Sequence, residues 1–335
     1  MEGHPKVSVI VPVYAVEEYV EQCAASLFSQ SWDNCEFIFV DDGTPDRSVS
    51  VIEKILDTSF PSLRSRVQIL HEPNSGLPRA RMTGLAAATG DFIIHVDSDD
   101  WVEPDYVSHL VGKALEEDAD VVYCDFYKEY SKKVPGYYAE GEVSPSIGPV
   151  AVKCMHNSVI RAYMWNKLVR RSLYDLDSMI VPKWGYHEDI VFQTQILYGA
   201  RKVVHLHEAL YHYRRKRKGA LTSYSLVKTR RQSAENMFLL YDALPKDRGP
   251  VTSCGEDILL RGGWYSSIIL DFKLLRSHPD AEGPCWIWIM SVDAAFQSAS
   301  SASQSSFAAS FVWKIIRNRV FLRHDRLVYR NGCRT

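Results

Sequence analysis

The sequence predicts an α/β fold whose mostly parallel sheet is covered by helices on both faces. Over the first 125 residues, short apolar runs rich in β-branched residues alternate with segments whose apolar positions recur at the spacing of one helix face. The chain has 335 residues, of which 46% are hydrophobic and 24% charged, so it is long enough for one large globular domain and a smaller one.

The predicted elements follow one another in strand and helix order. Strands are expected at 7–13, 36–40, 67–70, 92–96 and 120–126, where apolar runs are short. Helices are expected at 16–28, 47–56, 78–88 and 104–116, and the third of these has Pro78 at its start, where proline fits a helix. This alternation indicates a Rossmann-like arrangement of strands joined by helical crossovers.

After residue 126 the alternation stops. Residues 127–150 are rich in Gly, Pro, Ser and Tyr and predict an irregular surface excursion. Further on, helices are expected at 152–170, 190–198 and 226–244, and extended segments at 202–205 and 209–214. The sequence thus predicts a first domain over 1–215, with a distinct part from about 127, and a mainly helical C-terminal region over 216–335.

Bulk properties exclude several classes of protein. A formal net charge of −2 gives no overall attraction to nucleic acid, and the seven cysteines form no C-x-x-C pair. Scattered free thiols are typical of a reducing cytosol. No signal-peptide pattern and no apolar run of about 18 residues occurs, so a cytoplasmic protein without a membrane span is expected.

Three acids lie within four positions directly after the strand predicted at 92–96. They are Asp97, Asp99 and Asp100, with Ser98 between them. Crowded carboxylates at a strand end are costly unless a cation neutralises them, and ligands bind at the carboxyl ends of strands in open α/β sheets. The pattern indicates a divalent metal site; an acidic turn that caps the next helix is the alternative.

A second acidic pair, Asp41 and Asp42, precedes Gly43 after the strand at 36–40. Acids after two strands predict a single crevice, in which one carboxylate accepts hydrogen bonds from a base or ribose. Helix capping near Thr44 or Asp46 is the alternative, and both roles are compatible.

The segment from Asn74 to Arg81 reads as a loop followed by a helix start that carries Arg79 and Arg81. Helix N-termini and arginines both suit phosphate, the former through free N–H groups and the latter through a rigid donor fork. A solvated helix face is the alternative.

Together these residues resemble the inverting family 2 glycosyltransferases with the GT-A fold. The matching segments stand in the family's order: Val9-Ile10-Val11-Pro12-Val13-Tyr14, Val40-Asp41-Asp42-Gly43, Asn74-Ser75-Gly76, Ala80-Arg81, Gly90-Asp91 and Val96-Asp97-Ser98-Asp99-Asp100. This combination is much more specific than any single motif. It departs from the family at Met82, where Asn is common, and at Thr44-Pro45-Asp46, where Ser-Thr-Asp is common, which leaves the details of the donor open.

The resemblance implies a role for each matching position. Pro12 and Tyr14 would border the nucleotide base, and Asp42 or its neighbour Asp41 would bond it. Arg81 and Ser98 would lie at the nucleotide, and Asp97 would contact the ribose region. Asp99 would ligate Mn²⁺ or Mg²⁺ bound to the diphosphate, and oxygen ligands suit either ion.

Two later motifs resemble the family's acceptor side: the segment from Trp165 to Leu168, which contains Lys167, and the segment from Tyr186 to Phe192. Asp189 resembles the catalytic base, since inverting transfer needs a carboxylate opposite the leaving group to take the acceptor proton. Adjacent side chains on a helix diverge by ~100°, so Glu188 is expected to support Asp189 rather than share its position.

Two basic segments are expected to meet ligands. Five consecutive cations begin at Arg214, and with His212 this residue could close over the diphosphate; a solvated loop is the alternative. The basic, aromatic tail at 311–330 predicts peripheral contact with the inner face of the cell membrane, or packing against its own domain. No nucleic-acid-binding module surrounds either run.

The expected reaction moves a sugar from a nucleotide diphosphate sugar, with a UDP-sugar favoured, to a hydroxyl of a glycan or lipid-linked acceptor. Synthesis of cell-surface polysaccharide is the expected setting, with assembly into homo-oligomers left open. The loop from Val13 to Val16 has no glycine, which disfavours nucleotidyl transfer and dinucleotide oxidoreduction. A non-catalytic nucleotide-sugar-binding or scaffold protein of a glycan assembly complex is the alternative.

Overall fold

The computed structural model describes residues 4–130, 134–156 and 158–215, together with eight helical residues between 229 and 240. These eight are Thr229, Gln232, Ser233, Glu235, Asn236, Met237, Leu239 and Leu240. The chain divides into two compact units, Met1–Val251 and Thr252–Thr335, and every described residue belongs to the first. The helical positions fall within the helix predicted at 226–244. The remainder of the C-terminal region predicted at 216–335, including the tail at 311–330, lies outside the described residues.

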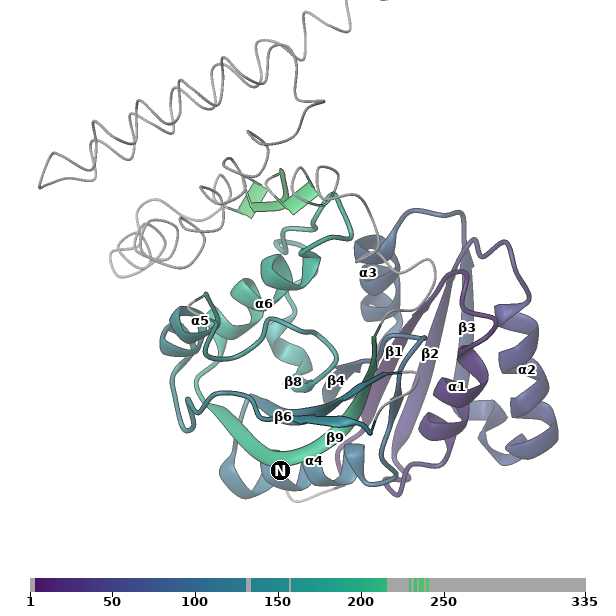
Figure 1. The fold of residues 1–335 in the computed structure, drawn as a ribbon, viewed down its shortest axis with the longest axis horizontal. Helices are drawn as coiled ribbons and strands as arrows, with labels where there is room; N and C mark the ends of the chain where they lie inside the picture. The colour runs from purple at the N-terminus through teal and green to yellow at the C-terminus, as the bar shows by residue number, and fades with distance from the viewer. Residues whose placement is uncertain are drawn as a thin grey trace, which may run out of the picture. The chain divides into compact units, whose positions relative to one another are not determined.

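The predicted α/β class is confirmed by a single large sheet and its helices (Figure 1). The strands are β1 (Val7–Val13), β2 (Cys35–Asp42), β3 (Val67–Glu72), β4 (Phe92–His95), β5 (Trp101–Val102), β6 (Val121–Glu129), β7 (Gly136–Tyr138), β8 (Lys167–Arg170) and β9 (Val203–Arg214). The helices are α1 (Val20–Phe28), α2 (Ser48–Ser59), α3 (Leu77–Ala87), α4 (Tyr106–Glu117), α5 (Gly148–His156) and α6 (Glu188–Gly199), with short 3₁₀ turns at Pro61–Arg66 and Arg171–Leu173.

The N-terminal half of the sheet is parallel. The strand order is β3-β2-β1-β4-β8-β6-β9-β5, with β7 paired to β6, and β1, β2, β3 and β4 all pair in parallel. Parallel strands need crossover connections, which α1, α2 and α3 supply. The carboxyl ends of β1, β2 and β4 therefore lie at the same edge of the sheet.

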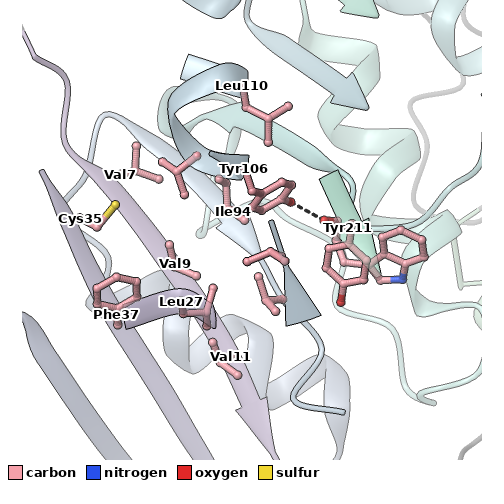
Figure 2. Packing of buried hydrophobic residues seen from close by; sticks show 14 of the residues in the cluster. Val7, Val9, Val11, Leu27, Cys35, Phe37, Ile94, Tyr106, Leu110 and Tyr211 are labelled. Carbon is pink, nitrogen blue, oxygen red and sulfur yellow. Dashed lines mark hydrogen bonds between the residues drawn. The ribbon is translucent and has the colours of Figure 1, made fainter. Parts of the chain in front are cut away.

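Strand β1 is buried along its whole length, because helices cover both of its faces. Val7, Val9 and Val11 face the core that Leu27 of α1 and Leu110 of α4 also enter (Figure 2). Side chains alternate along a strand, so Ile10 faces the other way. There α3 packs closely enough that a Cβ on Gly84 would come within 2.3 Å of the Ile10 Cγ2 atom. A glycine at this helix position lets α3 lie directly on the sheet.

The second half of the sheet is mixed rather than parallel. Strand β8 pairs antiparallel with β4 and β6, and β5 pairs antiparallel with β9, while β6 and β9 are parallel. The helix predicted over 152–170 is wrong beyond His156, because Lys167–Arg170 forms β8 between β4 and β6. The apolar spacing of such a short segment fits a helix or a strand, and its central position in the sheet decides between them.

The two extended segments predicted at 202–205 and 209–214 form one strand, β9. Its register with β6 shifts at the centre, where Cys124 pairs with Leu206 and Asp125 with Ala209. Such an irregularity leaves residues of one strand without a partner on the other and redirects their side chains. None of the helices formed by the described residues is long and apolar enough to cross a membrane.

Candidate active site

Asp42 anchors the loop that follows β3. The side chain is buried, and its carboxylate accepts hydrogen bonds from the backbone N–H of Ser75 at 2.5 Å and of Gly76 at 3.0 Å. Gly76 has a φ of 88°, a conformation that favours glycine, so the loop reaches the carboxylate without strain. Burial raises the pKa of Asp42, and the N–H donors oppose this rise. Asp42 thus fixes the loop that leads into α3.

Asp41 lies beside Asp42 and is more open to solvent. One of its oxygens accepts the Thr44 N–H at 2.8 Å, and the other lies 2.9 Å from the Nδ1 of His71. Asp46 holds the backbone before α2, where its Oδ1 accepts the Ser48 N–H at 3.1 Å, but the N-cap position is Arg47 and makes no side-chain capping bond. On the same edge of the sheet, Tyr14 follows β1 with 46% of its surface exposed, whereas Pro12 is buried within β1.

Arg81 joins the acidic turn after β4 to the start of α6, although it precedes Glu188 by 107 positions in the sequence. Its Nη2 donates to Oδ1 of Asp97 at 2.9 Å and to Oε1 of Glu188 at 3.4 Å. The side chain is only 2% exposed, so a solvated helix face is excluded for this arginine. Burial opposes its charge, but the two carboxylates outweigh burial and raise the pKa of Arg81. Its Nε and Nη1 atoms have no hydrogen-bond partner within the part of the chain that the structure describes.

The acidic turn after β4 divides its carboxylates between two tasks. Asp100 is wholly buried and accepts the Tyr211 hydroxyl at 2.9 Å and the Arg214 N–H at 2.7 Å. Burial, with Asp99 and Asp97 nearby, raises the pKa of Asp100 well above its usual range. Asp97 and Asp99 are partly exposed, and Ser98 between them is buried. The turn therefore concentrates negative charge that a cation would relieve.

Arg214 ends β9 against this turn. Its Nε donates to the backbone oxygen of Asp99 at 2.8 Å, and its guanidinium lies 4.7 Å from the ring centre of Trp101. His212 faces elsewhere: its ring nitrogens lie 2.7 Å from a carboxylate oxygen of Glu129 and 2.8 Å from one of Glu103. Arg214 is thus at the acidic turn, whereas His212 braces the sheet. The basic run beyond Arg215 lies outside the described residues.

The start of α6 places two carboxylates differently. Glu188 is buried and reaches Arg81, while Asp189 is partly exposed and its Oδ1 accepts the Ile190 N–H at 2.9 Å. Burial and the neighbouring Asp189 raise the pKa of Glu188 to about 8, and burial also raises the pKa of Asp189. The two side chains diverge, as adjacent positions on a helix do.

Trp165 and Lys167 are both buried. The Lys167 Nζ donates to the backbone oxygens of Arg161 and Tyr163 and to Oδ1 of Asn166, each at 2.8 Å. Burial lowers the pKa of Lys167 to about 8. The Trp165 ring stacks between Tyr163 and Tyr211, with ring centres 4.5 and 4.3 Å away. In this structure both side chains are therefore part of the packed interior, where Lys167 holds the backbone at Arg161 and Tyr163.

Sequence reasoning missed Tyr211 and Cys23. The Tyr211 oxygen accepts the Asp97 N–H at 3.2 Å while its hydroxyl donates to Asp100, so it fixes both ends of the acidic turn. The Cys23 thiol lies beneath the turn, 3.8 Å from the Asp97 backbone oxygen. No motif marks either residue, because their contacts arise only from strand and helix packing between distant segments.

Comparison with known proteins decides the family. Residues 8–182, just over half of the chain, match the family described as Glycosyl transferase family 2. The chain belongs to glycosyltransferase family 2. The match includes the acidic turn and the Asp41-Asp42 pair and ends before α6, so the assignment does not depend on Glu188 or Asp189.

Curated relatives match a large part of this family 2 protein. EpsH of Bacillus subtilis (strain 168) is 33% identical over 217 residues, which are 63% of this chain and 61% of EpsH. This chain therefore spans less than two thirds of EpsH. The uncharacterized glycosyltransferase EpsJ of the same strain is 31% identical over 259 residues, which are 76% of this chain and 74% of EpsJ.

Solved structures confirm the GT-A fold. Residues 1–349 of Staphylococcus aureus TarS in complex with UDP-GlcNAc superpose with a TM-score of 0.61 at 21% identity, covering 76% of this chain and 71% of that one. The mannosyltransferase PcManGT of Pyrobaculum calidifontis, in complex with GDP-Man and Mn²⁺, gives a TM-score of 0.54 at 15% identity, covering 93% of this chain and 84% of that one. At these identities the likeness concerns the fold.

Proposed function

We propose that this family 2 protein is an inverting, metal-dependent glycosyltransferase. It transfers a sugar from a nucleotide diphosphate sugar, with a UDP-sugar favoured, to a hydroxyl of a glycan or lipid-linked acceptor in the synthesis of cell-surface polysaccharide. The observation that carries the proposal is the double contact of Arg81, which holds Asp97 of the acidic turn and Glu188 of α6 on one guanidinium. This contact supports assigning the acidic turn and the start of α6 to one site.

Asp189 is the proposed catalytic base. Glu188 is buried on Arg81, whereas Asp189 is more open and follows it at the start of α6. In the reaction, the acceptor oxygen forms a bond to the anomeric carbon as the bond to the donor phosphate oxygen breaks. The acceptor proton passes to Asp189, and the nucleotide diphosphate leaves with the electron pair. A raised pKa favours proton acceptance, because a stronger base is a better proton acceptor.

Asp99 is the proposed ligand of Mn²⁺ or Mg²⁺. The surrounding charge fits such an ion, since three carboxylates crowd one turn: burial, and then the charges of Asp99 and Asp97, raise the pKa of Asp100. Carboxylate oxygens suit both ions. When bound, the ion would act as a Lewis acid toward the diphosphate. Arg214 holds the backbone oxygen of Asp99 and so keeps the turn in place.

The nucleotide side of the proposal draws on the edge of β1 and β2. Tyr14 is exposed there and Asp41 is partly open, so these side chains can reach a base, while Pro12 and Asp42 hold the backbone around them. A UDP-sugar is favoured because TarS, which shares the fold, was crystallised with UDP-GlcNAc and with UDP.

Release of nucleotide diphosphate tests the proposal. The purified full chain is given UDP-, GDP- and dTDP-sugars with Mn²⁺ or Mg²⁺ and an extract of glycan and lipid-linked acceptors. Metal-dependent release from one donor is expected. It should fall by at least about 100-fold in Asp189→Ala, the lower range for losing one acid–base group, and Asp99→Ala should lose the stimulation by metal. Asp57→Ala, which removes an exposed carboxylate from α2, is the matched control.

Two outcomes would contradict the proposal. Equal release in Asp189→Ala and in the Asp57→Ala control would remove Asp189 as the base. Donor binding by calorimetry without release from any donor, in the presence of acceptors, would favour a non-catalytic nucleotide-sugar-binding protein.

A further inference from the structure

A second cluster of metal-ligating side chains lies on β6 and β9, apart from the acidic turn. One ligand-capable atom from each of Asp125, His205 and His207 falls within 4.8 Å of the others. The shifted register explains the cluster: Leu206 pairs with Cys124 and Ala209 with Asp125, which leaves His207 without a partner on β6. The irregular strand thus turns two histidines of one strand toward the same loop.

The first histidine, His205, is held rigidly in the interior. Its side chain is 1% exposed and its ring stacks on Tyr123, with ring centres 4.5 Å apart. Its Nε2 lies 2.8 Å from Oδ1 of Asp125. That carboxylate also accepts the Glu140 N–H at 2.8 Å and the Tyr137 hydroxyl. An ionised carboxylate only accepts, so Nε2 carries the proton and the Nδ1 lone pair points the other way.

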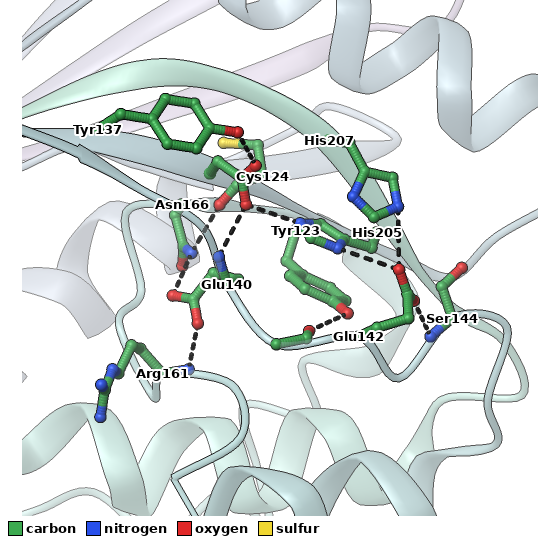
Figure 3. A network of polar contacts seen from close by, with 12 residues as sticks. Tyr123, Cys124, Tyr137, Glu140, Glu142, Ser144, Arg161, Asn166, His205 and His207 are labelled. Atoms are coloured by element: carbon green, nitrogen blue, oxygen red, sulfur yellow. Dashed lines mark hydrogen bonds and ion pairs between the residues drawn. The ribbon is translucent and has the colours of Figure 1, made fainter.

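The Nδ1 atom of His205 points at a carboxylate. It is buried, makes no hydrogen bond to any described residue, and lies 3.4 Å from Oε2 of Glu142 (Figure 3). The Nε2 atom of His207 lies 2.9 Å from the same Oε2. The other oxygen of Glu142 accepts the Ser144 N–H at 2.6 Å, which fixes the carboxylate. A lone pair facing a carboxylate oxygen is repulsive unless a cation lies between them.

We propose that a divalent ion of the zinc class binds His205 through Nδ1, His207 through Nε2 and Glu142 through Oε2. Zinc bonds to nitrogen and carboxylate oxygen measure about 2.0–2.2 Å, so ligand atoms at the corners of a tetrahedron are ~3.4 Å apart. The two distances to Oε2, 3.4 and 2.9 Å, lie near that edge. His207 is 68% exposed, which leaves room for water as the fourth ligand.

Asp125 acts as the positioning residue rather than as a ligand. Metal-bound histidines commonly donate their other ring N–H to a carboxylate, which fixes the ring and its tautomer. The bond from His205 Nε2 to Asp125 has this form. Imidazole nitrogens suit Zn²⁺ better than the Mg²⁺ or Mn²⁺ proposed at Asp99, so the two sites differ in ligand chemistry.

The ion would tie the loop after β7 to β9. Glu140 of that loop accepts the Asn166 side-chain N–H at 3.2 Å, and Asn166 in turn holds Lys167 at 2.8 Å. A metal at Glu142 therefore fixes a loop that contacts the acceptor-side motif. The inference concerns binding and stability and does not rest on the proposed transfer reaction.

Metal binding in an Asp99→Ala background tests the proposal, because this change removes the ligand proposed for the other ion. The full chain is stripped with chelator and titrated with Co²⁺ and Zn²⁺, following visible absorption of Co²⁺ and bound metal by equilibrium dialysis. One equivalent is expected, together with a higher Tm in Zn²⁺. His207→Ala should weaken the affinity by at least about 10–100-fold, the loss that even an outer-shell partner causes. Asp125→Asn should weaken it within that range.

The matched control is His109→Ala. His109 is also an exposed histidine beside a carboxylate, Glu208, at 2.6 Å, and both variants keep every cysteine. This control should bind like its parent. His207 is exposed, so its loss leaves the fold intact, which the Tm without metal checks. Equal affinity in His207→Ala and His109→Ala, or no stoichiometric binding by the parent, would overturn the proposal. A proton on His205 Nδ1, and not a metal ion, would then account for the approach of that atom to Glu142.

Discussion

Replacing Arg81 with Met tests the arrangement on which the site depends. The substitution keeps a long side chain but removes the charge that faces Asp97 and Glu188. Arg81 is 2% exposed and Glu188 8%, so water cannot replace the lost partner. Removing one member of a buried ion pair costs about 3–5 kcal/mol, because the other charge stays buried without compensation.

The cost should depend on pH. The pKa of Glu188 is already raised to about 8 by burial and by Asp189, and losing Arg81 raises it further. A carboxyl with a raised pKa costs folding free energy once the pH exceeds its ordinary value near ~4.3, since the fold must then take up a proton or bury a charge. Parent and variant both take up this proton below about pH 8, so the destabilisation of Arg81→Met relative to the parent should increase above about pH 8, where Glu188 ionises beside Arg81 in the parent but stays protonated in the variant.

Thermal unfolding measures the effect. At about 2–4 °C per kcal/mol for a unit of this size, the Tm should fall by roughly 6–20 °C. The double variant Arg81→Met with Glu188→Gln should recover part of the loss, because the uncompensated charge is gone. The control is Arg64→Met, an exposed pair with Asp57 that is worth at most about 1 kcal/mol. A fall in Tm no larger than in the control, or one independent of pH, would refute the reasoning.

Two further predictions concern the sheet that carries the site. Burial raises the pKa of Glu36, but hydrogen bonds from Lys6, Ser8 and Thr89 together outweigh burial and bring this pKa down to about 2. A lowered pKa stabilises the fold above the unfolded value near ~4.3 and loses this contribution as the pH falls toward 2. In urea unfolding, Glu36→Gln should lower the free energy of unfolding by about 2 kcal/mol at pH 7, after solvent screening is allowed for, and by little at pH 2. An equal loss at both pH values would contradict this account of Glu36. Gly84→Ala in α3 should lower the Tm, because overpacking on Ile10 costs about 1–3 kcal/mol. This cost exceeds the roughly 0.5–1 kcal/mol by which alanine is favoured over glycine inside a helix. A raised Tm would contradict the close packing of α3 on the sheet.

Much of the first half of the fold was predictable from local pattern. The strands β1, β2 and β4 follow from short apolar runs bounded by polar or turn residues, and the helices α1, α2 and α3 follow from apolar spacing and proline position. The structure of the segment 152–170 was not predictable in this way, since Lys167–Arg170 forms a strand through its pairing with β4 on one side and β6 on the other. Strand direction in the second half was equally beyond periodicity, which is the same for parallel and antiparallel strands.

The candidate site shows the same division. Asp97, Asp99, Glu188 and Asp189 are visible as acids beside predicted element ends, and the resemblance orders them. Their separate roles are not visible in the sequence: Asp100 accepts hydrogen bonds from Tyr211 and Arg214, and Glu188 accepts one from Arg81. His205 ends the extended segment predicted at 202–205, and His207 falls in the gap before the segment predicted at 209–214. Their two-residue spacing would have been a signal only if the two segments had been joined into one strand, since side chains two positions apart on a strand share a face.

The sequence by itself determined the residue types that can bind a cation, accept a proton or face a phosphate, and the local elements that carry them. The tertiary structure alone decided which of these groups meet, since contacts between Arg81 and Glu188 or between Asp125 and His205 join residues 107 and 80 positions apart. It also shifted their pKa values, because burial, which raises the pKa of Glu188 and lowers that of Lys167, is a property of packing rather than of neighbouring positions in the chain.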